Sequence, residues 1–396
     1  GQFSLKLGNS TIYNKTFSSD KLQEKQITTN DSRYRIGSIS KMFTAVMIMQ
    51  LTEEKKIKLT DKLSKYYPKV DNADKIKIED LLRHRSGIKD YINSTEAINC
   101  YDQTITVEQV LKKIYEYESI FEPNSKAEYS NTNYFLLSLI LEKITKKDFN
   151  TNLISRISKP LNLKNTYLSV NPTNKTNFEV PSYTFNTQWN EFAQTNYKIA
   201  LGAGGLISTA NDLTTFINGL FTHKLVKKET LNLMTDIKEG YGLGLAVIPF
   251  NDRRMFGHGG KIDMYETLVA YYPAEKFSFA TIYNGVNTVT NDITVGILSI
   301  YYQQPFIFPD FTDIEVDTAI LESYEGIYKT NEIPMKIKIF IKDKKLYAQA
   351  TGQSEFPLSA KTKSEFAFDP ARIKISFEKG KFTLNQSGMK IIFEKE

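Results

Sequence analysis

A serine and a lysine three residues apart open a long apolar helix pattern, at Ser38-Ile39-Ser40-Lys41. The spacing Ser-x-x-Lys alone selects no site, because it occurs five times, starting at Ser18, Ser38, Ser86, Ser376 and Ser387. The pattern over residues 38–55 differs from the others, because it predicts a helix that is apolar nearly all round and on which positions i and i+3 share a face. Burial lowers the pKa of a lysine, so Lys41 can accept the proton of Ser38, whose backbone N–H at the helix start can bind an oxyanion. The alternative interpretation is a helix cap followed by a lysine that reaches solvent.

Tyr129-Ser130-Asn131 precedes a second apolar helix pattern, over residues 133–145. A tyrosine phenol beside a lysine ammonium is expected to have a lowered pKa and to carry protons. An asparagine amide can orient a substrate carbonyl. Taken alone, the same residues are equally typical of a helix N-cap.

A histidine flanked by glycines, in Gly257-His258-Gly259-Gly260-Lys261, lies between two candidate strands. Glycines allow a substrate backbone to approach closely, although a strand-end turn also explains them. Two other Gly-rich stretches, residues 202–205 and 240–244, show neither the strand–GxGxxG–helix context of a dinucleotide site nor a P-loop. His84 is interpreted as a structural hydrogen-bonding residue, and His223 as a surface residue.

The composition excludes several classes of protein. The 396 residues carry 51 Lys and Arg against 45 Asp and Glu, a net charge of +6, without a run of five basic residues, so no nucleic-acid partner is expected. Cys100 is the one cysteine, which excludes a disulfide within the chain and a cysteine metal cluster. With three histidines and no calcium-loop spacing, we expect no metal site. Because no stretch of 18 apolar residues occurs, we expect no transmembrane helix, and the first residues lack the apolar region of a signal peptide.

The order of the expected elements predicts an α+β protein. Strands at both ends of a mostly helical middle suggest one antiparallel sheet. We expect a hairpin over residues 3–17, helices over 107–117, 211–220 and 291–302, and strands over 241–248, 265–272 and 277–283. These elements predict a domain over residues 1–305, a linker over 306–319 and a small all-β module over 320–396, built as a meander or barrel.

The motifs follow one another in the order Ser-x-x-Lys, Tyr-x-Asn and a Gly-flanked basic residue on a late strand. In this order they resemble the serine β-lactamase and penicillin-binding protein superfamily, and in particular its branch of class C β-lactamases, D,D-carboxypeptidases and esterases. The resemblance covers about residues 1–304 and extends to residues 34–41, 81–88, 203–213 and 241–244. The tail from Tyr324 resembles, less closely, small β-modules appended to such enzymes.

The resemblance implies a β-lactamase/transpeptidase-like fold, in which an antiparallel sheet is flanked by helices and joined by a helical subdomain. It also implies acyl transfer without a cofactor, with Ser38 as the nucleophile, Lys41 as its activating partner and Tyr129 as the proton shuttle. The implied substrate-binding residues are Asn131, His258, Gly259 and Gly260, and the implied oxyanion hole consists of the backbone N–H groups of Ser38 and Lys261.

His258 stands where β-lactamases of this superfamily carry the lysine of a Lys-Thr-Gly motif. An unperturbed histidine loses its charge above about pH 6.5, which weakens a salt bridge to a substrate carboxylate, so efficient β-lactam hydrolysis is not expected. The resemblance therefore predicts a serine hydrolase of small-molecule or peptide amide or ester bonds, like a D,D-peptidase or an esterase, that binds β-lactams or hydrolyses them slowly.

Two alternatives remain from the sequence. One is a true class C-like β-lactamase, and the other is a catalytically weak penicillin-binding-like protein that only binds a ligand or partner. By family, the expected location is extracytoplasmic, in the periplasm or cell envelope. The sequence leaves the oligomeric state open.

Overall fold

The structure, a computed structural model, describes residues 1–18, 28–92, 105–168, 179–185, 188–306, 308, 312–386 and 388–396. Cys100 and parts of the expected linker, residues 307 and 309–311, lie outside the described residues. The chain divides into two compact units, one of Gly1–Ser182 with Glu191–Gly285 and the other of Tyr183–Asn190 with Val286–Glu396. The boundaries predicted from the sequence stay predictions. None of the described helices combines the length and the apolar character that crossing a membrane requires.

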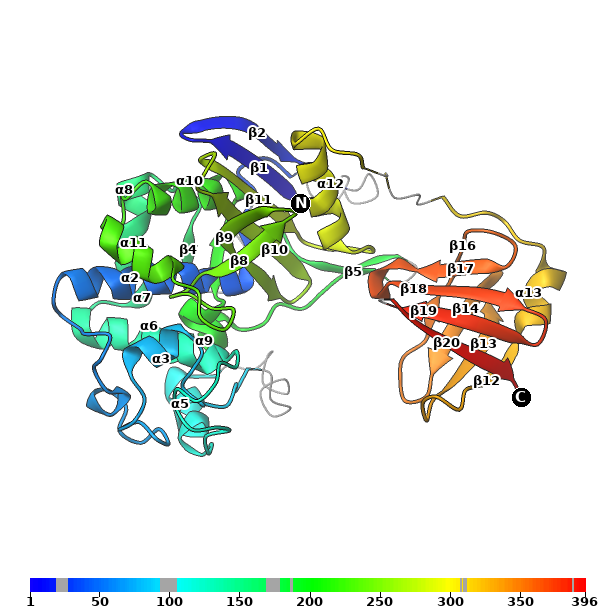
Figure 1. Cartoon of the computed structure of the whole chain (residues 1–396), viewed down its shortest axis with the longest axis horizontal. Coiled ribbons are helices and arrows are strands. Elements are labelled where there is room, and N and C mark those ends of the chain that lie inside the picture. The colour runs from blue at the N-terminus through cyan, green and yellow to red at the C-terminus, as the bar shows by residue number, and fades with distance from the viewer. Residues whose placement is uncertain are drawn as a thin grey trace. The chain divides into compact units, whose positions relative to one another are not determined.

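In the described part of the first unit, six antiparallel strands form one sheet (Figure 1). Their order across the sheet is β2 (Ser10–Thr16), β1 (Gln2–Leu7), β11 (Phe277–Tyr283), β10 (Tyr265–Tyr272), β9 (Arg253–Ile262) and β8 (Ala246–Phe250). β1 pairs with β11, with Gln2 opposite Ile282 and Leu7 opposite Phe277. This pairing confirms the predicted α+β class and a sheet assembled from strands far apart in the sequence.

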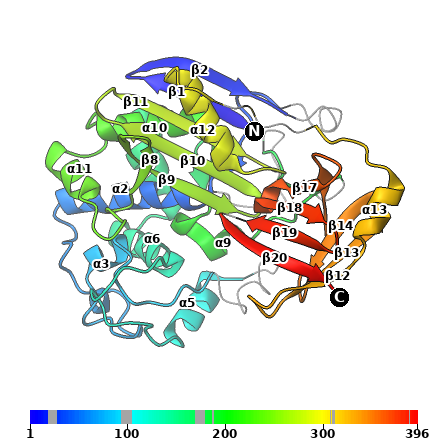
Figure 2. The same cartoon turned by 45° about the vertical axis from the view of Figure 1, so that its right-hand side comes forward.

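The helix that follows Ser38 is buried on nearly all sides (Figure 2). One 3-10 turn (Gly37–Ile39) leads into α2 (Ser40–Glu53). α10 (Ala210–Phe221) contacts both α2 and the sheet: Phe216 stacks on Phe43 of α2 at 3.7 Å, and Thr214 hydrogen-bonds Ser4 of β1 at 3.1 Å. α6 (Asn131–Thr145) packs against α2 as well. These neighbours explain why the sequence of α2 is apolar nearly all round.

Polar side chains begin the helices close to the predicted positions. Thr209 caps α10, because its Oγ1 accepts the N–H of Asp212 at 3.2 Å. α6 begins at Asn131, two residues before the predicted start, because the backbone is extended only as far as Ser130. Further helices of this unit are α3 (Ile78–Leu82), α5 (Val107–Tyr115), α7 (Phe149–Leu153), α8 (Lys159–Leu161), α9 (Tyr197–Ala200) and α11 (Lys228–Thr235).

The Gly-rich segment around His258 belongs to a strand and does not form a turn between strands. It lies in β9, where His258 pairs with Val269 of β10. A Cβ on Gly257 would lie 1.9 Å from the carbonyl oxygen of Val269, and one on Gly260 would lie 2.0 Å from that of Ile36. Gly257 therefore lets β9 lie close against β10, and Gly260 lets it approach the segment that precedes α2.

A small sheet of β3 (Tyr34–Arg35), β7 (Leu206–Ser208) and β4 (Tyr167–Leu168) holds the other side of that segment. Tyr34 pairs with Ser208, and the N–H of Ile36 donates to the carbonyl of Leu206 at 3.0 Å. The strand predicted over residues 241–248 starts only at Ala246, where β8 begins.

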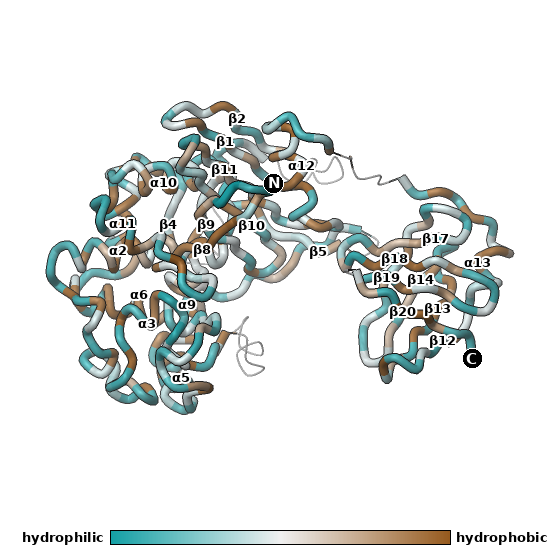
Figure 3. Tube along the Cα trace, viewed as in Figure 1, coloured by the Kyte–Doolittle hydropathy of each residue, from teal (hydrophilic) through white to brown (hydrophobic). Residues whose placement is uncertain are grey.

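The second unit contains a β-meander that closes on itself. Its sheet runs in the order β15 (Phe356–Pro357), β14 (Lys345–Ala350), β13 (Lys336–Lys342), β12 (Gly326–Lys329), β20 (Met389–Lys395), β19 (Lys381–Gln386), β18 (Ile373–Glu378), β17 (Glu365–Phe368) and β16 (Ser359–Ala360). Leu358 alone separates the two outermost strands of this order, so the sheet forms a barrel, as predicted. Hydrophobic and hydrophilic residues alternate along its strands (Figure 3). Further elements of the unit are α12 (Thr290–Tyr301), α13 (Thr318–Tyr324) and β5 (Tyr183–Phe185).

Candidate active site

The turn before α2 holds Ser38 half-buried beside β9. Gly37 has a φ of +50°, and a Cβ on it would lie 2.7 Å from the backbone nitrogen of Lys261, so the position requires glycine. Ser40 fixes the same turn, because its hydroxyl donates to the carbonyl of Gly37 at 2.7 Å and accepts the N–H of Leu206 at 3.2 Å. The backbone next to Ser38 thereby lies against the backbone of Lys261.

Lys41 is completely buried, and its Nζ contacts three oxygen atoms. It lies 3.1 Å from Ser38 Oγ, 2.7 Å from Asn131 Oδ1 and 2.7 Å from the carbonyl oxygen of Ala203. Burial lowers the pKa of Lys41 to about 7, and the negative charge of Asp90 opposes this shift. A substantial fraction of the protein therefore carries a neutral amine at this position near neutral pH.

The three contacts determine what the neutral amine can do. The side-chain oxygen of Asn131 and the carbonyl of Ala203 can only accept hydrogen bonds. The two protons of a neutral amine bind these two oxygens, so its lone pair is left for Ser38 Oγ. In this state Lys41 can take the hydroxyl proton of Ser38, whereas a protonated ammonium donates to all three oxygens and cannot.

Tyr129 donates its hydroxyl hydrogen bond to Ser38 Oγ at 2.8 Å. Lys41 Nζ lies 4.9 Å from the centroid of its ring. The predicted lowering of the Tyr129 pKa is wrong: burial raises the pKa of this phenol, and the hydrogen bond to Ser38 opposes the rise. Tyr129 therefore stays protonated at neutral pH and is available as a proton donor.

Asn131 connects Lys41 to an acidic residue. Its Nδ2 donates to Asp90 Oδ2 at 2.8 Å, while its Oδ1 accepts from Lys41. The side-chain amide is thus oriented from both ends, and one N–H of Nδ2 is left over. Asp90 follows the Ser86-Gly87-Ile88-Lys89 tetrad in a loop, and no motif in the sequence singles it out.

His84 contacts both the ring of Tyr129 and the backbone of the residue that follows it. Its Nδ1 accepts the N–H of Ser130 at 3.1 Å, and its ring stacks on that of Tyr129 at 4.4 Å. Burial and the nearby charge of Lys41 keep the pKa of His84 well below its usual value, so the ring is neutral. These contacts agree with its interpretation as a structural hydrogen-bonding residue.

The Gly-rich stretch at residues 202–205 has a role that the sequence analysis missed. A Cβ on Gly202 would lie 2.3 Å from Thr44 Oγ1 of α2 and 2.4 Å from Ser138 Oγ of α6. The glycine therefore lets this backbone lie between the two helices and present the Ala203 carbonyl to Lys41. The signal available in the sequence was the glycine content of residues 202–205, because glycine allows a backbone to approach its neighbours closely.

His258 is half-buried on β9, with its ring centroid 6.4 Å from that of Tyr129. Its Nδ1 makes a hydrogen bond to the carbonyl of Gly259. Burial, together with the charge of Lys41, lowers the pKa of His258 to about 4, below the value of an unperturbed histidine. Gly259 itself is exposed, and the Lys261 side chain points away to an ion pair with Glu266 at 2.8 Å.

The model of the Beta-lactamase family matches residues 7–298 of the sequence. The chain belongs to the Beta-lactamase family. It is 25% identical over 404 residues to penicillin-binding protein 4* of Bacillus subtilis, covering 94% of this chain and 88% of that protein. It is 29% identical over 206 residues to the teichoic acid D-alanine hydrolase of Staphylococcus aureus, covering 52% of this chain and only half of that protein.

A solved structure extends the likeness to the fold. The crystal structure of a D-stereospecific amidohydrolase from Streptomyces sp. superposes with a TM-score of 0.62 at 29% identity, covering 72% of this chain and 88% of that one. The chain belongs to this family, and its relatives include hydrolases. It is therefore a serine hydrolase with the β-lactamase-like fold.

The fold of this family member brings the four side chains of the first two motifs into direct contact. Ser38, Lys41, Tyr129 and Asn131 form one hydrogen-bonded cluster, and His258 lies beside it. Gly260 and Lys261 approach the backbone of Ile36 and Gly37 just before Ser38, whereas Gly259 is exposed on the same strand.

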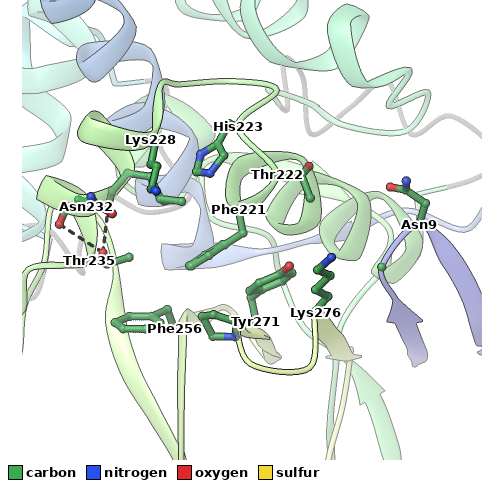
Figure 4. Close-up of a pocket in the computed structure, with 13 residues that line it drawn as sticks. Asn9, Phe221, Thr222, His223, Lys228, Asn232, Thr235, Phe256, Tyr271 and Lys276 are labelled. Carbon is green, nitrogen blue, oxygen red and sulfur yellow. Dashed lines mark hydrogen bonds between the residues drawn. The ribbon is translucent and has the colours of Figure 1, made fainter.

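A separate cavity of about 480 Å³ lies beside the first half of β9, between the end of α10, α11 and the turn after β10 (Figure 4). Aromatic and basic side chains line it, among them Phe221, Phe256, Tyr271, His223 and Lys228. His223 is exposed here, in agreement with its interpretation as a surface residue. None of the four clustered side chains around Ser38 lines this cavity.

Proposed function

We propose that the protein hydrolyses amide or ester bonds through an acyl-enzyme on Ser38, and that its acyl donors are D-amino-acyl compounds. The observation that carries the proposal is the double contact of Ser38 Oγ, 3.1 Å from Lys41 Nζ and 2.8 Å from Tyr129 Oη. A hydroxyl between an amine base and a phenol acid is the arrangement that nucleophilic acyl transfer needs. The D-amino-acyl class rests on the two relatives named for D-alanine and D-stereospecific hydrolysis.

The proposed reaction begins with attack of Ser38 Oγ on the substrate carbonyl carbon while its proton passes to Lys41. The backbone N–H groups of Ser38 and Lys261 bind the resulting oxyanion. Tyr129 then gives its proton to the leaving nitrogen or oxygen, the C–N or C–O bond breaks, and Lys41 returns the proton to the tyrosinate. Water attacks the acyl-enzyme with the same groups, and the acid product leaves.

The pKa values favour Lys41 over Tyr129 as the base. The pKa of Lys41 falls to about 7 on burial, whereas the pKa of Tyr129 rises, so a neutral amine beside a phenol is far more populated than a charged ammonium beside a phenolate. Asn131 acts first as a positioning residue for Lys41, and its remaining N–H is left to bind a substrate amide.

Intact-protein mass spectrometry with a fluorophosphonate and a fluorescent penicillin tests the proposal. We expect one fluorophosphonate adduct on Ser38 and slow or incomplete labelling by the penicillin. Hydrolysis of D-alaninamide but not L-alaninamide tests the D-amino-acyl class. An unlabelled Ser38 would support the alternative of a catalytically weak binding protein, and rapid turnover of penicillin would support a true β-lactamase. The extracytoplasmic location stays a prediction of the family.

A further inference from the structure

The hydrogen bond of His258 to its own strand determines where its proton lies. Nδ1 faces the carbonyl oxygen of Gly259, which can only accept. Nδ1 must therefore carry the N–H. A neutral imidazole has a single ring proton, so Nε2 of His258 has none and can only accept a hydrogen bond.

The groups packed around His258 keep it in this neutral state. Burial and the charge of Lys41 lower its pKa to about 4. His84, across the Tyr129 ring, is neutral too, and Tyr129 is protonated. Lys41 is the cation of this cluster when it is protonated, and its contacts are to Ser38, Asn131 and Ala203.

The position of His258 relates it to one half of the substrate. In the proposed reaction Tyr129 delivers a proton to the leaving group, so the leaving group must lie next to the Tyr129 hydroxyl. His258 belongs to β9, and its ring lies next to the ring of Tyr129. The leaving group, and not the acyl group, is therefore the half of the substrate that reaches His258.

We propose that His258 selects leaving groups that present a hydrogen-bond donor, such as a primary amide or a hydroxyl, over leaving groups that end in a carboxylate. This inference rests on the proposed function and narrows its substrate class. A donor pairs with the free acceptor on Nε2. A carboxylate would meet a second acceptor there and would lose part of its hydration without gaining a partner.

Nitrogen-15 NMR of protein labelled at histidine tests the tautomer without any turnover. The chain has three histidines, so His258→Gln and His223→Gln assign the signals, with His223 as the exposed control. We expect a protonated Nδ1 and an unprotonated Nε2 on His258 from pH 5.5 to 8.5. A protonated Nε2, or titration of this ring near pH 6.5, would overturn the inference even if Ser38 proves reactive.

Three matched ligands test the selectivity: D-alanyl-glycinamide, D-alanyl-glycine N,N-dimethylamide and D-alanyl-glycine. At the C-terminal group of the glycine they offer a hydrogen-bond donor, a neutral acceptor and a charged acceptor, in that order. The binding of each ligand is measured by how strongly it slows fluorophosphonate labelling of Ser38. We expect the primary amide to protect about fivefold better than the dimethylamide, the size of one hydrogen bond, and better still than the acid. Equal protection by all three, or none by any, would contradict the inference, whereas an unlabelled Ser38 would contradict the proposed function itself.

Two variants sharpen the assignment. His258→Phe removes the acceptor and should abolish the advantage of the primary amide over the dimethylamide. His258→Lys supplies a donor and a charge, and should reverse the order so that the acid protects about tenfold better than before. The ratio of amide to acid should stay constant between pH 5.5 and 8.5 in the unaltered protein, because titration of Lys41 affects both ligands. A ratio that falls below pH 6.5 would show that His258 becomes charged there and would overturn the inference.

Discussion

Two copies of the Ser-x-x-Lys pattern lie in the same unit of the molecule, and they differ in almost every property except spacing. At Ser38 the lysine is completely buried and lies 3.1 Å from the serine hydroxyl. At Ser86 the serine is buried and donates to Asn133 Oδ1 at 2.6 Å, while Lys89 is exposed, with its Nζ 4.6 Å from the centroid of the Tyr117 ring. The spacing of the motif therefore predicts nothing about reactivity by itself.

Backbone conformation accounts for the difference. Ser38 is followed by helix, so the side chains three residues apart project from the same face. Ser86 is followed by Gly87 at a φ of +77°, where a Cβ would lie 2.1 Å from the carbonyl oxygen of Phe121, and the chain turns away. Burial lowers the pKa of Lys41, so this lysine can become a base near neutral pH.

Removing the two serines should give the largest contrast. Ser38→Ala should abolish labelling by a fluorophosphonate, because the attacking oxygen is gone, while its melting temperature stays close to that of the unaltered protein. Ser86→Ala should keep the labelling but lower the stability by about 1–3 kcal/mol, since Asn133 loses a buried partner. Mass spectrometry and thermal melting measure both effects, and loss of labelling in the Ser86 variant alone would reverse the assignment.

Tyr129→Phe should lower the hydrolysis of an amide substrate by about 10² or more, the usual effect of a lost general acid. Tyr117→Phe is the matched control, because its ring contacts Lys89, the lysine of the pattern that starts at Ser86. Steady-state kinetics on an amide and on an activated ester separate the roles. The rate of ester hydrolysis should fall less than that of amide hydrolysis, since the leaving group of the ester hardly needs a proton. Unchanged amide hydrolysis in the variant would mean that Lys41 alone transfers the protons.

The pH dependence of acylation should report on Lys41. Its neutral form is the base and its pKa is lowered to about 7, so kcat/KM should fall about tenfold per pH unit below pH 7 and level off above it. Asp90 raises the pKa of Lys41, so Asp90→Asn should move the midpoint to lower pH. Rate profiles from pH 5 to 9 measure the shift. A midpoint that moves upward would show that Asp90 acts by some other route.

Lys89→Met should have the smallest effect. The exposed ammonium contacts an aromatic ring, a contact that contributes about 0.5–1 kcal/mol at exposed sites. Activity should stay within about twofold of the unaltered protein. The free energy of unfolding, measured with urea, should fall by no more than the contribution of that contact. Lys41→Met, made alongside, should remove acylation. A comparable loss of activity in both variants would mean that burial is not what distinguishes the two motifs.

Local patterns in the sequence predicted the elements well where periodicity and caps decide them. The buried α2, the capped α10 and the strands β10 and β11 follow from apolar spacing and from turn residues. The residues alone left the Gly-rich segment of β9 between two candidate strands, with a strand-end turn as the alternative interpretation. Close approach to the backbone of Ile36 is a tertiary contact that glycine spacing does not encode.

The candidate site was predictable as far as its motifs extend. The contact between Ser38 and Tyr129 followed from the resemblance of the motifs to a family. The carbonyl of Ala203 and the carboxylate of Asp90 escaped prediction, because backbone atoms have no sequence signature and a single loop aspartate has no spacing. The pKa of Tyr129 was predicted in the wrong direction, because only the structure shows how deeply the phenol is buried.

The pairing of β1 with β11 has a consequence for how the protein is made. Leu7 and Phe277 are partners, so a ribosome completes the first strand long before its neighbour exists. Closing a loop of that length costs roughly 5 kcal/mol in chain entropy, which only later contacts repay. Until then the hairpin of β1 and β2 is an isolated two-stranded ribbon, which is marginal in water and exposes an unpaired edge. We expect folding of this unit to wait until β11 has been made and to depend on protection of that edge while the chain grows.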